Sequence, residues 1–128
     1  MNAQAIMIAY AALGGAFGAV LRAALSEKFN PARTGFAWGT FSANMLASII
    51  LGILTAYAGA NGMSANAEML LNAGFCATLS TFSSLVWEIT QMIKKRAYRL
   101  CAAYALSTFI CGMVCFVAAE ELCAKIFG

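Results

Sequence analysis

The stretch FAWGTFSANMLASIILGILTAYAG, residues 36–59, decides the fold of this chain because it contains no charged side chain. A helix of about 20 predominantly apolar residues is long enough to cross the hydrocarbon core of a bilayer. We therefore predict that residues 36–59 form a membrane-spanning helix.

Three other stretches, residues 3–21, 69–87 and 100–119, are also free of charge. Hydrophobic residues make up 62% of the 128 residues and charged residues only 10%, whereas a soluble domain averages about 25% charged residues. The sequence thus predicts an all-α membrane protein that forms a single transmembrane domain, residues 1–128. Its four helices are expected at about residues 3–25, 36–59, 68–93 and 98–123.

The basic residues are unevenly divided between the two sides of the membrane. Four crossings place both termini and the second connection on one side, and the first and third connections on the other. Seven basic residues fall in or beside the first and third connections, and only Lys125 falls on the opposite side; the seven are Arg22, Lys28, Arg33, Lys94, Lys95, Arg96 and Arg99. The positive-inside rule then predicts that the first and third connections are cytoplasmic. These residues lie beside lipid headgroups, so membrane lipid is an expected partner and nucleic acid is not.

No arrangement of residues typical of a catalytic or metal site is found. The chain has no histidine, and its five cysteines form no CxxC motif. We interpret the cysteines as small core residues and expect no enzymatic activity.

The first two spans carry stripes of small or polar residues at four-residue spacing. In the first span Gly14 and Gly18 form a face that another helix backbone can approach closely, while Arg22 can extend its charged end to the headgroups. In the second span Thr40 and Asn44 bring hydrogen-bonding groups into an apolar helix. An unpaired amide in hydrocarbon costs several kcal/mol. Asn44 therefore either joins two helices or belongs to a polar path.

The third span contains the densest polar run, GFCATLSTFSS at residues 74–84, with five hydroxyl residues between Thr78 and Ser84. Serine and threonine side chains compete for backbone groups, so we predict a break in this helix near the middle of the membrane; the alternative is an intact helix whose hydroxyls bond to its own carbonyls. Glu88 follows, an ionisable residue near the end of the span. Thr40 and Glu88 are therefore candidates for a polar path. In the fourth span Tyr104 and Thr108 repeat the four-residue spacing.

Three of these segments resemble the motifs of a known family. Residues 14–22, GGAFGAVLR, resemble a glycine-rich first-helix motif that ends in arginine. Residues 39–44, GTFSAN, resemble a G-T-x-x-x-N motif. Residues 74–84 with Glu88 resemble the signature G-F-x-G-x-x-T-T-F-S-T-F-x-x-E. Through these motifs the chain resembles the Fluc/CrcB family of fluoride channels over its whole length.

The resemblance implies an antiparallel, dual-topology dimer with two pores in a bacterial plasma or inner membrane. Such a dimer would export cytoplasmic fluoride passively and thereby lower its toxicity. It would hold a structural sodium ion at the dimer centre, on the backbone carbonyls of Ala77 and Ser80. Arg22 would lie at a vestibule. The fluoride pore would be lined by Asn44, Phe82, Ser83, Ser84, Tyr104 and Thr108.

The sequence departs from the family pattern in ways that leave alternatives open. Leu85 stands where the family has a second phenylalanine, and Ala77 where a glycine is expected. The seven-to-one charge bias suits a subunit with a fixed orientation, whereas a dual-topology homodimer should show little bias. The family includes heterodimers of oppositely oriented subunits, so the partner is either a second copy or such a homologue. The chain could also be a non-conducting or half-degenerate subunit. A small multidrug exporter would need a carboxylate deep in the membrane, typically in the first span, and that span has none.

Overall fold

The computed structural model describes residues 2–30 and 35–128. Arg33, which contributes to the charge bias, lies outside the described residues. Within the two described ranges the chain forms helices and connections but no strand. Four helical spans are long and apolar enough to cross a membrane, Ala3–Phe29, Trp38–Asn61, Ala65–Lys94 and Tyr98–Phe127. The prediction of an all-α protein with four transmembrane helices is confirmed.

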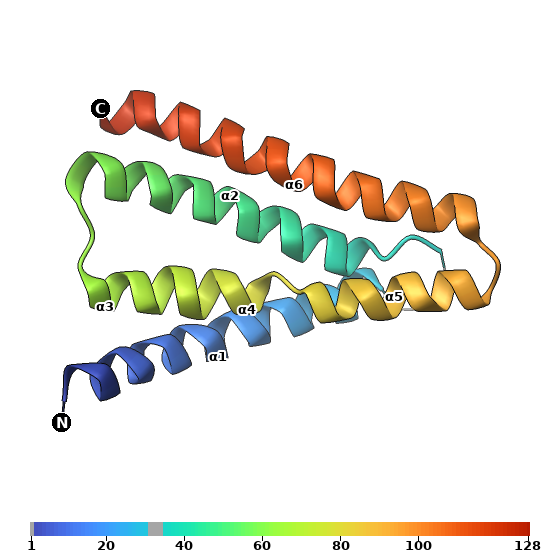
Figure 1. Ribbon diagram of the computed structural model, residues 1–128, viewed down its shortest axis with the longest axis horizontal. Helices are drawn as coiled ribbons and strands as arrows, with labels where there is room; N and C mark the ends of the chain where they lie inside the picture. Colours follow the sequence, from blue (N-terminus) through green and yellow to red (C-terminus); the bar gives the residue numbers. More distant parts are fainter. Residues whose placement is uncertain (1, 31–34) are drawn as a thin grey trace.

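Seven elements make up these spans. They are α1 (Ala3–Phe29), α2 (Trp38–Asn61), α3 (Ala65–Glu68), the π-helical segment η1 (Met69–Cys76), α4 (Ala77–Leu79), α5 (Phe82–Lys94) and α6 (Tyr98–Phe127). The first and last helices continue beyond the predicted ends at residues 25 and 123, to Phe29 and Phe127. Both termini lie at one end of the molecule, as an even number of spans requires (Figure 1).

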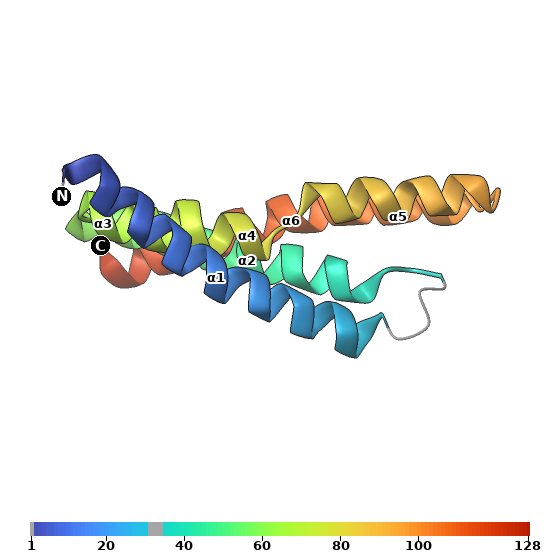
Figure 2. The same ribbon diagram turned by 90° about the horizontal axis from the view of Figure 1, so that it is seen from below.

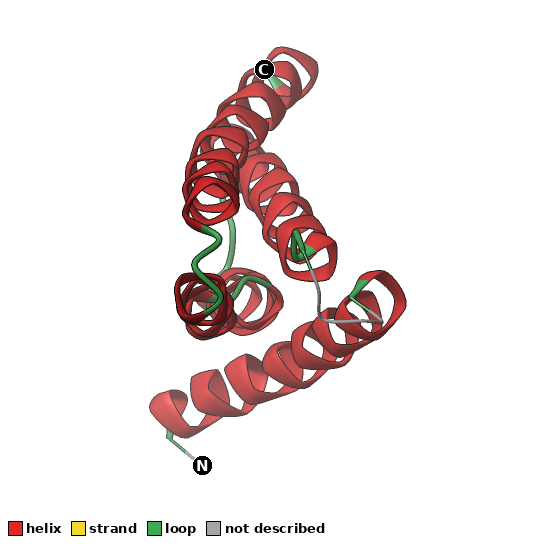
Figure 3. Cartoon of the chain, turned by 90° about the vertical axis from the view of Figure 1, so that its right-hand side faces the viewer, coloured by secondary structure: helices red, strands yellow, loops and turns green. Residues whose placement is uncertain are grey.

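Two helix pairs organise the molecule: α1 packs along η1, and α2 packs along α6 (Figures 1 and 3). In the first pair the backbones touch. A methyl group added at Gly14 would overlap the carbonyl oxygen of Leu70, and one added at Gly18 would overlap the carbonyl oxygen of Phe75. Thr78 Oγ1 also donates to the carbonyl of Gly15 across the pair at 3.0 Å. The glycine stripe of the first span therefore packs against the third span.

The second pair is equally close. A Cβ added at Gly52 in α2 would lie 2.5 Å from the carbonyl oxygen of Phe116 in α6. Ala43 and Ala47, on the same helix, form the central apolar cluster with Leu79 from α4. Small residues in α2 thus allow it to contact α6 and the third span together.

The third span is interrupted at Ser80 and Thr81. Both residues have extended backbone angles, with ψ of 150° and 122°, and the helix resumes at Phe82. The predicted break is confirmed, and the alternative of an intact helix is wrong. The two-residue interruption is visible as the thin trace between α4 and α5 (Figure 1).

Beyond the break, α5 packs chiefly on α6 and separates from the ends of α1 and α2 (Figure 2). Its large apolar side chains Phe82, Val86, Trp87 and Ile93 are exposed in the single chain. The end of the molecule that holds the first and third connections is therefore more open than the end that holds the termini.

Replacing Gly18 with alanine should destabilise the fold, because the new methyl group would overlap the backbone of Phe75. Overpacking of this kind costs about 1–3 kcal/mol. Gly59→Ala is the matched control, since nothing lies within 4 Å of a Cβ at Gly59. Thermal unfolding in detergent, followed by circular dichroism, should show a lower midpoint for Gly18→Ala only. Equal midpoints for the two variants would contradict the close packing of α1 on the third span.

Candidate functional site

An amide side chain from α2 satisfies the backbone at the break. Asn44 Oδ1 accepts a hydrogen bond of 2.8 Å from the N–H of Thr81. In a continuous helix this N–H would donate to the carbonyl of Ala77, four residues earlier. Asn44 thus takes the donor that the break releases, and the carbonyl of Ala77 loses its usual helical partner. Of the two roles left open for Asn44, the joining of two segments is present in the structure.

Thr81 is the N-cap of α5 and lies close to the hydroxyls of the next two serines. Its Oγ1 accepts from the N–H of Ser84 at 3.3 Å, which is the geometry of a helix N-cap. The same oxygen lies 3.2 Å from Ser83 Oγ and 3.3 Å from Ser84 Oγ. Two predicted pore residues, Ser83 and Ser84, therefore lie next to the break. Asn44 joins them through Thr81.

A second polar cluster lies further along α5, around Glu88. Thr40 Oγ1 donates to Glu88 Oε1 at 2.7 Å, and the hydroxyl of Tyr104 donates to Glu88 Oε2. Thr40 is 1% exposed and Tyr104 is completely buried, whereas Glu88 is half-buried. Three spans thus contribute one residue each to this cluster, which we call the carboxylate cluster (Thr40, Glu88 and Tyr104).

The ring of Tyr104 is fixed by its neighbours. Phe36 packs against it edge to face, with ring centroids 5.0 Å apart. Thr108, also buried, donates its hydroxyl hydrogen to the carbonyl of Tyr104 at 2.8 Å. The hydroxyl of Thr108 is therefore bonded to its own helix, one turn from the carboxylate cluster.

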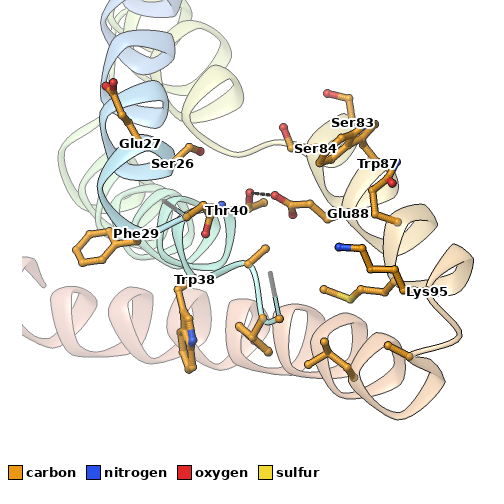
Figure 4. Close-up of a pocket in the computed structure, with 18 of the residues that line it drawn as sticks. Ser26, Glu27, Phe29, Trp38, Thr40, Ser83, Ser84, Trp87, Glu88 and Lys95 are labelled. Carbon is orange, nitrogen blue, oxygen red and sulfur yellow. Dashed lines mark hydrogen bonds between the residues drawn. The ribbon is translucent and has the colours of Figure 1, made fainter. Parts of the chain in front are cut away.

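A cleft of about 1330 Å³ opens beside the carboxylate cluster, between α1, α2 and α5. Thr40, Ser83, Ser84 and Glu88 all line it, so the cleft brings four predicted site residues together (Figure 4). Its other ionisable residues are Glu27 and Lys95. Its walls include parts of the first and third connections, for which the positive-inside rule predicts a cytoplasmic location.

Other predicted site residues lie apart from this cleft. Phe82, at the start of α5, is 78% exposed. Arg22 lies half-buried on α1 and is not among the residues that line the cleft. Ala77 and Ser80 line a separate cavity of about 170 Å³ with Ser48 and Asn72. The side-chain oxygen of Asn72 is buried without a hydrogen-bond partner among the described residues.

Sequence reasoning missed two members of the site. Thr81 was considered only as part of the hydroxyl run. A threonine just before an apolar helix is a usual N-cap signal, and this signal could have located the start of α5. Phe36 was counted as part of a span, and no local pattern indicates that its ring meets Tyr104, because the two residues are far apart in the chain.

The chain is a small multi-pass membrane protein with a polar site among its four apolar spans. The site contains the helix break, which is bonded to the Asn44 amide, and the cleft lined with hydroxyls. A family model described as CrcB-like protein, Camphor Resistance (CrcB), matches residues 9–119. This chain belongs to the CrcB-like family.

Relatives from several bacteria cover most of the chain. It is 36% identical over 104 residues to the protein named fluoride-specific ion channel FluC 1 of Geobacillus kaustophilus, an alignment that covers 81% of this chain and 86% of the relative. A protein named fluoride-specific ion channel FluC from Bacteroides fragilis is 29% identical over 119 residues, covering 90% and 94%. The protein of the same name from Acinetobacter baumannii is 32% identical, covering 82% of each chain.

Replacing Asn44 with leucine should destabilise the protein, because the N–H of Thr81 would lose its acceptor inside the membrane. An unpaired N–H in the hydrocarbon region costs several kcal/mol. Ser48→Ala is the matched control on the same stripe, since Ser48 Oγ donates only to the carbonyl of Asn44 in its own helix, at 2.9 Å. Unfolding midpoints measured by circular dichroism should fall for Asn44→Leu and stay near that of the unmodified chain for Ser48→Ala. A leucine variant as stable as the unmodified chain would mean that Asn44 does not hold the break.

Proposed function

We propose that this chain is a subunit of a passive fluoride channel through which cytoplasmic fluoride leaves the cell. The observation that carries the proposal is the group of donors at the break of the third span: the Asn44 amide and the hydroxyls of Ser83 and Ser84, which Thr81 links. The names of the bacterial relatives support fluoride as the ion.

These side chains suit fluoride because the ion is small and strongly hydrated, and a path across the membrane must replace its water with hydrogen-bond donors. The bond to Thr81 uses the oxygen of the Asn44 amide. The Asn44 amide nitrogen, which carries two N–H groups, makes no hydrogen bond with the described residues and is left to meet an anion. The same side chain can thus hold the backbone and face the ion.

The path is completed by a second subunit in an antiparallel dimer. Phe82 supports this part of the proposal, since its ring is 78% exposed beside the break and has the positive edge that an anion favours. One chain alone leaves this ring facing lipid. A partner that covers α5 would enclose Phe82 in a pore.

The partner in this proposal is an oppositely oriented homologue; the alternative is a second copy, in which case this chain would conduct alone. The seven-to-one distribution of basic residues favours a single orientation of this chain. An antiparallel dimer then needs a subunit with the opposite bias. Leu85, in place of a second phenylalanine, fits a subunit whose own contribution to the pore is incomplete.

Sodium at the dimer centre would be held by the carbonyls of Ala77 and Ser80. The residues present fit this ion, because the Thr81 N–H that would bond Ala77 in a helix is engaged by Asn44. A carbonyl without its helical donor is a suitable ligand for a hard cation. The ion would stabilise the break and would not itself take part in fluoride transport.

Liposomes that contain this chain and are loaded with fluoride should release it with strong selectivity over chloride, alone or after a sibling subunit is added. Asn44→Asp should abolish the release, because it places a negative charge beside an anion path while keeping an acceptor for Thr81. Fluoride and chloride electrodes measure the two fluxes, and circular dichroism checks that the variant is folded. Absence of selective fluoride release in both preparations would refute the proposed function, and full release by the folded aspartate variant would remove Asn44 from the path.

Tags at both termini should be accessible from one side of the membrane only. The expectation follows from the charge bias, and protease protection in inside-out and right-side-out vesicles measures it. A variant with Lys94, Lys95 and Arg96 changed to glutamine reduces the bias from seven-to-one to four-to-one. It serves as the comparison and should show a weaker preference for one orientation. A mixture in the unmodified chain would favour the homodimer.

A further inference from the structure

The donors of the carboxylate cluster form an anion site that the chain fills with its own side chain. A hydroxyl has one hydrogen to donate, and the hydroxyls of Thr40 and Tyr104 both donate theirs to Glu88. While Glu88 stays in place, neither hydroxyl can donate to a mobile anion. The predicted role of Tyr104 in the fluoride path is therefore blocked in this arrangement.

The two donors are preorganised. Thr40 stands in the first turn of α2, where Gly39 packs tightly against α1; a Cβ on Gly39 would lie 2.7 Å from the Cα of Ser26. Tyr104 is completely buried and is held by Phe36. Both hydroxyls thus keep their position whether or not Glu88 occupies the site.

The carboxylate, in contrast, has room to leave. Glu88 is half-buried, stands on α5 and faces the cleft of about 1330 Å³ (Figure 4). Rotation of its side chain toward Lys95, which lines the same cleft, would place the carboxylate nearer a cation.

We propose that Glu88 is a tethered competitor that occupies the Thr40 and Tyr104 hydroxyl site until a small monovalent anion displaces it. This inference rests on the proposed function, in which that anion is fluoride. The site opens on the same cleft as Ser83 and Ser84, so displacement of Glu88 would add two hydroxyls to the donors that the anion meets there. Like charges cannot share such a site without a large cost, which makes the exchange one anion for another.

Glu88→Gln tests the proposal because it keeps the shape of the side chain and removes the competing charge. Sodium fluoride binding to the purified variant in detergent, measured by calorimetry, should be tighter by roughly tenfold or more than binding to the unmodified chain. Adding Thr40→Val or Tyr104→Phe to this variant should remove the gain, since each substitution deletes one donor. Sodium chloride, titrated at the same ionic strength, should show no comparable gain.

Glu27→Gln is the matched control. Glu27 lines the same cleft and carries the same charge, but no hydroxyl among the described residues donates to it. Its neutralisation should change fluoride binding by less than about twofold, because general electrostatic attraction to the cleft is screened by salt. If Glu27→Gln tightened binding as much as Glu88→Gln, the effect would come from net charge and the proposal would be overturned.

Unchanged or weaker fluoride binding by folded Glu88→Gln would also overturn the proposal. Should the glutamine variant fail to fold, Glu88→Ala carries the same expectation and decides the question. The result is separable from the proposed function. Selective efflux by the unmodified chain with no gain in binding defeats only this inference. A gain in binding without efflux in any preparation defeats only the channel.

Discussion

A broken helix inside a membrane must find a partner for every backbone group it exposes, and this constraint organises the chain around the bond from Thr81 to Asn44. Water is absent from the hydrocarbon region, so an unpaired N–H there costs several kcal/mol. One amide side chain meets the need. Because it comes from α2, the same bond also fixes the third span against the second, and the central cluster of Ala43, Ala47 and Leu79 forms where the two segments meet.

The polar residues then fall into two groups with different tasks. Near the break, Thr81 caps α5 and collects Ser83 and Ser84, so the capping that begins the helix also concentrates donors at one depth. Further along, Thr40 and Tyr104 satisfy a carboxylate that would otherwise be expensive inside a membrane span. The proposed transport thus depends on the same hydrogen bonds as the structure, which is why substitutions at these positions need a stability measurement beside each transport measurement.

The sequence predicted the features that depend on local pattern. Charge-free stretches located the four spans, and the glycines at positions 14 and 18 indicated a close helix contact without naming its partner. The hydroxyl run indicated a break, since adjacent Ser and Thr weaken a helix wherever they occur. The pairs that define the site could not be predicted in this way. Asn44 with Thr81, and Phe36 with Tyr104, are joined by the packing of separate spans, and spacing along one helix carries no information about which residue of another helix it meets.

The contacts of the third span also suit the order in which the chain is made. Synthesis proceeds from the N-terminus, and the third span has the lowest mean hydropathy of the four, 1.4. The contacts of its first half and of its break precede it in the chain: the glycine surface of α1, against which η1 packs, and the Asn44 amide for the N–H of Thr81. Both are therefore already made when this least apolar segment enters the bilayer, and only α5 depends on α6, the last helix to be made.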